Sequence, residues 1–294
     1  MSLFVKFWGV RGSIPVPGIT TRRYGGNTAC VEVRSARSRF VLDAGTGIRE
    51  LGIAMAAEAG PQRVHLLISH AHWDHIQGFP FFSPAYEARS QIHVYGVEPG
   101  DDRMHRLLSG QMHSSYFPVQ FSDLAGAIVA ADLSGGQCTI DDVDVRALPV
   151  FHPGGCLSFR LTQGSSSVVY ATDNELDQVL VNPELAAGTS GGPLRRLPDA
   201  LVDFAAGASL LIADGQYTDL GYTNHRGWGH SRATTAVDFA VQAGVPKLAI
   251  FHHDPMQTDA EVEEKIDACR QRVVELGAQL EVFAAREGVE LRLD

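Results

Sequence analysis

Lysine is scarce in this chain of 294 residues, where it occurs only at positions 6, 247 and 265. Lysine and arginine together number 24 against 34 aspartate and glutamate residues, which gives a formal net charge of −10. A protein that follows a nucleic-acid backbone over many nucleotides needs a stripe of cationic side chains to neutralise the phosphates. The composition therefore predicts that no long nucleic acid is a partner.

Cysteine is also rare, and its four positions contain no C-x-x-C pair, which excludes a zinc knuckle and argues against a disulfide framework. The chain has no run of about 18 to 20 apolar residues, and its first residues lack a basic segment followed by an apolar core. We therefore expect a cytoplasmic protein that does not associate with membranes. The hydrophobic content of 45% is that of a globular protein with a sizeable core.

The most informative segment reads Ser-His-Ala-His-Trp-Asp-His over residues 69–75 and follows an apolar run typical of a buried strand. Alternate side chains of a strand point to the same side, so His70 and His72 are placed to bind one metal ion. A turn into a helix would bring Asp74 and His75 to a second ion close to the first. The segment therefore predicts part of a two-metal hydrolytic site.

Three other apolar, strand-like runs each end at a further candidate ligand. These ligands are His152 after 143–150, Asp173 after 167–172, and His252 after 248–251. A lone histidine after a strand is ordinarily a surface or capping residue, but five histidines and two aspartates at strand ends are too many for that explanation. Because each ion needs four or more ligands, these residues are expected to complete a site for two divalent cations.

The His-x-His-x-Asp-His motif resembles that of the metallo-β-lactamase fold superfamily and matches its signature without departure. The resemblance covers almost the whole chain and implies an α/β fold, a four-layer αββα sandwich, in a single domain of residues 1–294. It also implies how the ligands are divided. The first ion would be held by His70, His72 and His152, the second by Asp74, His75 and His252, and Asp173 would bridge both.

Two positions separate the chain from other branches of this superfamily. The antibiotic-hydrolysing branch usually has cysteine where Asp173 stands, and the di-iron relatives have glutamate in place of His72. The segments 7–15, 24–28 and 42–47 are instead similar to the phosphodiesterase-like branch, which includes cyclic phosphodiesterases and the tRNA 3′-processing ribonuclease.

That branch keeps a carboxylate and an imidazole beside the metals, and Asp214 and His230 stand at the matching places. The first of these is more often glutamate, so Asp214 departs from the pattern. Near the metals, Asp43 is expected to support the metal-binding loop. His230 would act as the general acid or bind the phosphate, and the alternative is a residue that only begins the helix after it.

These residues together predict a metal-dependent phosphodiesterase acting on a small phosphodiester such as a cyclic nucleotide. A hydroxide bridging the two ions would attack phosphorus, because the cations lower the pKa of water from about 15.7 towards 7. Asp74 and Asp173 would orient it, and His230, aligned by Asp214, would protonate the departing oxygen. Zinc suits the imidazole-rich ligands, while manganese and iron fit them as well.

Two other functions are compatible with the same residues. The first is an acyl hydrolase acting on a thioester or lactone, since the same hydroxide attacks a carbonyl carbon. The second is a metal-bound sensor or binding protein without turnover. Within segment 109–126, His113, Tyr116 and Phe117 are expected to line the substrate pocket or, alternatively, to pack their own loop. The oligomeric state is left open, a homodimer included.

The periodicity predicts alternating strands and helices. Strands are expected at 3–8, 29–33, 39–42, 64–68, 92–95, 128–130, 143–150, 156–162, 168–171, 209–213 and 247–251, with further pieces near 280 and 291. Helices are expected at 48–59, 101–108, 233–243 and 260–276.

Overall fold

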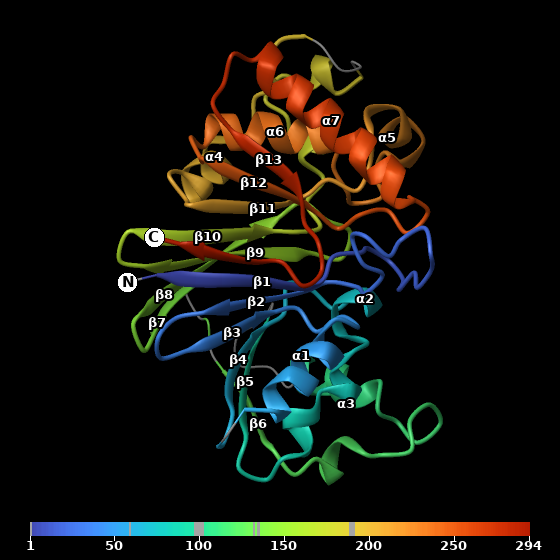
Figure 1. Ribbon diagram of the computed structural model, residues 1–294, viewed down its shortest axis with the longest axis vertical. Coiled ribbons are helices and arrows are strands. Elements are labelled where there is room, and N and C mark those ends of the chain that lie inside the picture. Colours follow the sequence, from blue (N-terminus) through green and yellow to red (C-terminus); the bar gives the residue numbers. More distant parts are fainter. Residues whose placement is uncertain (1, 59, 97–102, 132, 134–135, 188–191) are drawn as a thin grey trace.

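Two mixed β-sheets face each other at the centre of the molecule, and helices cover their outer sides (Figure 1). The computed structural model describes residues 2–58, 60–96, 103–131, 133, 136–187 and 192–294. Each sheet contains seven strands. This arrangement confirms the α/β fold and the four-layer αββα sandwich expected from the sequence.

The first sheet has the strand order β14-β1-β2-β3-β4-β5-β6. Its strands are β1 (Leu3–Gly9), β2 (Cys30–Arg34), β3 (Arg39–Leu42), β4 (Arg63–Leu67), β5 (Gln91–Tyr95), β6 (Ala127–Ala130) and β14 (Glu290–Leu293). The strands from β3 to β6 run parallel to one another. The carboxyl ends of β3 and β4 therefore lie together at one edge of this sheet.

The second sheet has the order β13-β12-β11-β10-β9-β8-β7. Its strands are β7 (Gln137–Ile140), β8 (Val143–Val150), β9 (Cys156–Gln163), β10 (Ser166–Ala171), β11 (Leu210–Asp214), β12 (Lys247–Phe251) and β13 (Glu281–Ala284). Strands β10 to β13 are parallel, and β9 is antiparallel to both β8 and β10. Strand β8 thus runs in the direction of β10, and β8, β10, β11 and β12 all end at the same edge.

The α-helices form the two outer layers, with α1 and α3 beside the first sheet and α4, α6 and α7 beside the second (Figure 1). Their bounds are α1 (Ile48–Ala56), α2 (Trp73–Ile76), α3 (Arg103–Gly110), α4 (Asp199–Ala205), α5 (Asp219–His225), α6 (Ala233–Gln242) and α7 (Asp259–Glu275). Within the described chain, no helix has both the length and the apolar character needed to span a bilayer.

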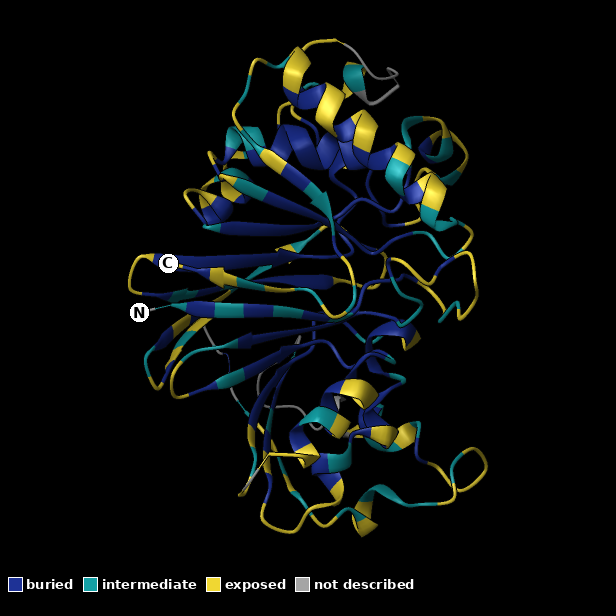
Figure 2. Cartoon of the chain, in the orientation of Figure 1, coloured by how far each residue is buried: buried dark blue, intermediate teal, exposed yellow. Residues whose placement is uncertain are grey.

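An apolar core fills the space between the sheets and draws residues from both. Phe7 and Phe40 of the first sheet belong to the same buried cluster as Phe159, Tyr170 and Phe251 of the second. A further core lies between each sheet and the helices that cover it. Figure 2 shows the strands as mostly buried and the exposed residues on the outer helix faces and loops. Burial on both faces explains why β10 and β11 read as continuous apolar runs.

Most expected strands and helices are present, with ends shifted by a few residues. Residues 101 and 102 of the expected helix 101–108 lie outside the described residues, and α3 begins at Arg103. The sequence patterns did not predict β7, α4 or α5. Helix α5 is short and contains glycine and threonine, which are weak helix formers. Its start is nevertheless capped, because Thr218 Oγ1 accepts a hydrogen bond from Gly221 N at 3.0 Å.

One buried histidine between the sheets makes folding stability depend on pH. Burial, together with the nearby Arg63 and His93, lowers the pKa of His65 to about 4. Between pH 4 and about 6.5 the unfolded histidine binds a proton that the folded one does not, so stability falls as the pH falls through this window. The part of the free energy of unfolding that is lost through His65 is about 3 kcal/mol at most.

We therefore expect His65→Gln to flatten the acid limb of stability, measured as the free energy of urea unfolding of the metal-free protein at several pH values. Tyr95→Phe is the control, because it removes only the hydroxyl that lies 3.1 Å from His65 Nδ1. The control should keep the slope of the parent protein. An unchanged slope in His65→Gln would refute the assignment.

Candidate metal centre

The first group of donors lies where the carboxyl ends of β4, β8 and β10 meet. Ligand atoms of His70, His72, His152 and Asp173 all lie within 4.8 Å of one another. His152 Nε2 is 3.1 Å from His72 Nδ1 and 3.7 Å from Asp173 Oδ2. His72 is exposed while the other three are buried, so this group reaches the surface at His72.

The second group consists of Asp74, His75 and His252, whose ligand atoms likewise lie within 4.8 Å of one another. Helix α2 begins directly after His72 and carries Asp74 and His75 in its single turn, while His252 follows β12. His252 Nε2 lies 3.1 Å from Asp74 Oδ2 and 3.2 Å from His75 Nε2. The structure thus brings together donors that are up to 178 positions apart in the sequence.

Asp173 lies between the two groups, with one carboxyl oxygen toward each. Its Oδ2 is 3.5 Å from His70 Nε2, whereas its Oδ1 is 3.2 Å from His75 Nε2 and 3.3 Å from His252 Nε2. A carboxylate in this position has the geometry needed to bridge two cations.

The backbone is strained at two of these positions. Asp173 and His252 adopt φ values of 47° and 58°, in the left-handed region that residues other than glycine seldom occupy. Such conformations cost about 1 to 3 kcal/mol each and persist where the surroundings fix them. Here Thr172 Oγ1 donates to Asp173 Oδ1 at 2.7 Å, and Gln216 Oε1 lies 2.9 Å from His252 Nδ1. The fold therefore aims both side chains at the cluster.

Asp43, at the carboxyl end of β3, holds the loop that carries the histidine motif. It accepts hydrogen bonds from Ser69 N at 2.7 Å, Ser69 Oγ at 2.8 Å and Tyr170 OH at 2.8 Å. His75 Nδ1 lies 2.8 Å from the same carboxyl group, which directs His75 Nε2 toward the cluster. Asp43 thus links the metal-binding loop to a tyrosine of the opposite sheet.

The protonation states suit metal binding. Burial lowers the pKa values of His70 and His152, which leaves neutral imidazoles, and the buried His70 Nε2 has no hydrogen-bond partner among the described residues. Burial raises the pKa of Asp74, but His75 and His252 outweigh this and hold it well below its ordinary value. The pKa of His75 is raised, because Asp173, Asp74 and Asp43 outweigh the effect of burial. Neutral imidazoles beside ionised carboxylates are the forms that bind divalent cations, so a cation in the second group would displace the proton that the raised pKa keeps on His75 in its absence.

A carboxyl–imidazole pair stands beside the second group. Asp214, the last residue of β11, places Oδ2 2.7 Å from His230 Nδ1. Burial alone would lower the pKa of His230, but Asp214 raises it to about 9. Asp214 and His230 also offer ligand atoms within 4.8 Å of those of Asp173 and His252, so geometry permits a second way of holding the second cation.

Sequence reasoning missed three contacts that hold the centre. Gln216 orients His252, and Ser13 N donates to Asp74 Oδ2 at 2.7 Å. The buried Glu175 accepts from Gly227 N at 2.6 Å and Gly229 N at 2.7 Å, while Gly229 O lies 2.9 Å from His152 Nδ1. Nothing in the local sequence distinguishes these three from ordinary polar residues.

The three predicted pocket residues contact their own loop and Phe81. His113 Nδ1 accepts from Ser115 N at 3.2 Å, the His113 ring contacts that of Tyr116, and Phe117 packs against Phe81. None of these contacts reaches a donor of the centre, so their role in substrate binding stays a prediction.

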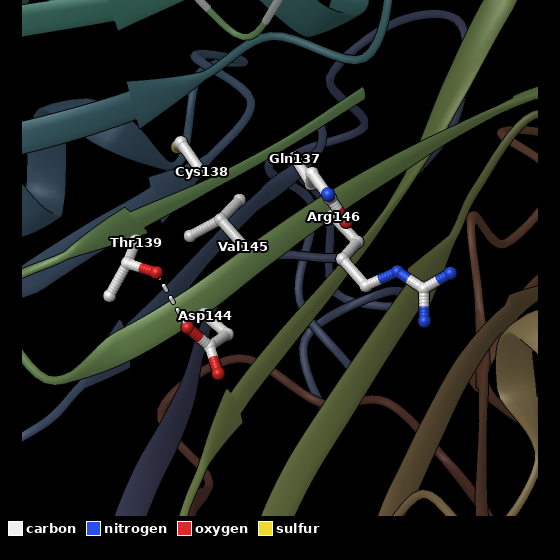
Figure 3. Close-up of a pocket in the computed structure, with 6 residues that line it drawn as sticks. All are labelled: Gln137, Cys138, Thr139, Asp144, Val145 and Arg146. Carbon is white, nitrogen blue, oxygen red and sulfur yellow. Dashed lines mark hydrogen bonds between the residues drawn. The ribbon is translucent and has the colours of Figure 1, made fainter. Parts of the chain in front are cut away.

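A pocket of about 440 Å³ lies on the β7–β8 hairpin, where Thr139 Oγ1 donates a hydrogen bond to Asp144 Oδ1 (Figure 3). It shares no residue with the metal centre.

The fold and the clustered donors define the class of a metal-dependent hydrolase with a dinuclear site. The profile of the beta-lactamase superfamily domain matches residues 38–253, and the chain belongs to this family. A full-length relative, ribonuclease Z of Haloarcula marismortui, is 22% identical over 100% of this chain and 98% of its own.

Two solved structures share the fold. The metallo-beta-lactamase fold protein YhfI from Bacillus subtilis has a TM-score of 0.65 and 18% identity, with 99% of both chains covered. The short form of human tRNase Z has a TM-score of 0.62 and 18% identity, with 98% of both chains covered.

These matches overturn the expectation that no long nucleic acid is a partner. The matched full-length relatives are named as ribonucleases, and a tRNase shares the fold. The expectation was wrong because it used the formal charge of the whole chain. Divalent cations in the site are the largest local charges there, and a count of side chains omits them.

The two donor groups predict the metal stoichiometry. We expect two equivalents per chain in the parent protein and one in either His70→Ala or His252→Ala, because each change removes a donor from one group only. Elemental analysis after dialysis measures this, and His113→Ala is the control that should keep two equivalents. If His230→Ala loses an equivalent while His75→Ala does not, the second cation is held by the alternative set with Asp214.

Proposed function

We propose that the chain is a metal-dependent phosphodiesterase that cleaves phosphodiester bonds of RNA. The observation that carries this proposal is the juxtaposition of the two donor groups with the Asp214–His230 pair at one edge of both sheets. Relatives named ribonuclease Z, which match from 78% to 100% of the chain, support RNA as the substrate. We also propose that residues 1–294 act as one domain, since one core joins both sheets.

The first cation would be held by His70, His72 and His152, the second by Asp74, His75 and His252, and Asp173 would contact both. We propose zinc, because the donors are imidazoles and carboxylates without a thiolate, and manganese and iron fit the same donors. When bound, such cations supply Lewis acidity and a nucleophile at neutral pH.

The residues of the chain then have distinct tasks. Asp74 has its Oδ2 fixed by Ser13 N, and Asp173 is fixed by Thr172 Oγ1, so both carboxylates are oriented before substrate arrives. His230 Nδ1 is engaged by Asp214, which leaves Nε2 to donate a proton to the departing oxygen. The Asp214 carboxyl group is itself fixed by the N–H groups of Gln216 and Ser231, at 3.1 and 3.0 Å.

A substrate panel tests the proposal. We expect the metal-loaded protein to cleave a single-stranded oligoribonucleotide and a hairpin with a single-stranded 3′ extension, with a higher kcat/KM than for 3′,5′-cyclic AMP or bis-p-nitrophenyl phosphate. A chelator should abolish cleavage. Turnover confined to cyclic AMP would indicate that the substrate is a small phosphodiester and not RNA. Turnover confined to a thioester or lactone would indicate an acyl hydrolase. Metal binding without any turnover would indicate a sensor.

Removal of the proposed proton donor should separate catalysis from metal binding. We expect His230→Ala to lower kcat on the RNA substrate by about 10²- to 10⁴-fold, the range typical of general acids, with two metal equivalents retained. His93→Ala, at a half-buried histidine of β5 outside the centre, is the matched control and should keep kcat. Parent-like kcat in His230→Ala would refute the role of His230.

A further inference from the structure

Three exposed aromatic side chains each stand one residue from the metal centre. Trp73 directly follows His72, Phe151 directly precedes His152, and Trp228 directly precedes Gly229. Their side chains are 74%, 49% and 63% exposed, respectively. Large aromatic rings left in water beside a buried polar centre are unusual, because each has apolar area that association would bury.

The residues beside these aromatics contact one another. His72 Nδ1 lies 3.1 Å from His152 Nε2, and His152 Nδ1 lies 2.9 Å from Gly229 O. Consecutive Cα atoms are about 3.8 Å apart, so Trp73, Phe151 and Trp228 begin within one residue of this chain of contacts. We call these three residues the aromatic rim. All three residues adjoin His72, His152 or Gly229 in the sequence, and His72 is the exposed member of the first donor group.

The backbone that carries the aromatic rim is held rigidly. Glu175 N donates to Phe151 O at 2.9 Å, while the Glu175 carboxyl group accepts from Gly227 N and Gly229 N on either side of Trp228. Gly229 has φ 92°, and a Cβ there would lie 2.3 Å from His152 Nδ1, so the loop is pressed against that histidine. One buried residue therefore fixes two members of the rim.

The ring of Trp228 is also held by neighbouring rings, and the backbone of Trp73 belongs to a helix. The Trp228 ring contacts His225 edge-on at 4.8 Å, and His225 stacks on the buried Tyr217 at 4.5 Å. Trp73 is the first residue of α2. Figure 1 places α2 and α5 toward the same side of the molecule, away from the two termini. Rings placed in advance lose little conformational freedom when a ligand stacks on them.

Resting on the proposed function, we propose that the aromatic rim stacks on unpaired nucleobases that flank the scissile phosphodiester. Stacking needs no particular base, because every base presents a π-face. The substrate class is therefore single-stranded RNA, such as a 3′ extension, selected by the presence of bases rather than by their sequence.

The test is a double-mutant cycle in which a residue of the aromatic rim is changed in the protein and a base is removed from the RNA. The cleavage position is first mapped on the hairpin with a 3′ extension, and the nucleotides on either side are then made abasic. We expect Trp73→Ala and Trp228→Ala each to lower kcat/KM on the natural RNA by about 5- to 140-fold. On the abasic RNA the same changes should have little further effect, since the stacking partner is already gone.

Two controls and one further measurement make the outcomes distinct. Ile53→Ala on α1 and Val274→Ala on α7 remove exposed large side chains outside the aromatic rim and the metal centre, and both should leave kcat/KM unchanged. Losses that add fully between rim variants and abasic RNA would overturn the proposal while leaving RNA cleavage intact, as would a rim variant that changes only the oligomeric state.

If the parent protein cleaves no RNA, the proposed function fails. Tryptophan fluorescence then tests separately whether the aromatic rim stacks on nucleobases. Quenching by an oligoadenylate, absent with an abasic oligomer of equal length and reduced in Trp73→Ala and Trp228→Ala, would support stacking. Absence of quenching would overturn it.

Discussion

Buried carboxyl groups crowded at one edge of the two sheets are the constraint on which the rest of the centre depends. Asp43, Asp74, Asp173 and Asp214 are all nearly inaccessible to water. Negative charge in such surroundings is tolerated only beside positive charge or hydrogen-bond donors. The histidines, the N–H groups and the hydroxyls around these carboxyl groups supply part of that compensation, and two divalent cations would supply the rest. The strained backbone at Asp173 and His252 is one cost of bringing the donors together.

The sequence was sufficient to find the side chains that the structure brings together, because their signal is local: a polar donor at the end of an apolar strand. Parallel strands end at a common edge, so the strand pattern alone indicates that His152, Asp173 and His252 meet. Glu175 and Gln216 could not be found in that way, because each acts on groups 36 to 54 positions away and has no pattern of its own. Helix α5 escaped prediction for a related reason, since its stability comes from tertiary packing rather than propensity.

Net charge misled about the partner for an instructive reason. A sum over the chain describes the field at long range, where screening weakens it within about 8 to 10 Å at physiological salt. Recognition of a phosphodiester at a metal centre is a short-range event, and stacking of a base on an aromatic ring likewise requires direct contact. An acidic protein therefore remains compatible with an RNA substrate when the contacts that matter are few and lie next to the reacting bond.

The donors come from both sheets: His70, His72, Asp74 and His75 from the first, and His152, Asp173 and His252 from the second. Hydrogen bonds of the protein itself also join the two halves near this point, among them Leu157 N to Ser69 O at 3.0 Å, His253 N to Val10 O at 2.9 Å and Tyr170 OH to Asp43. Cations bound by donors of both sheets would cross-link the two halves of the sandwich. Loss of metal would then weaken the association of the two sheets and lower the free energy of unfolding. Metal supply would therefore govern the stability of the protein as well as its chemistry.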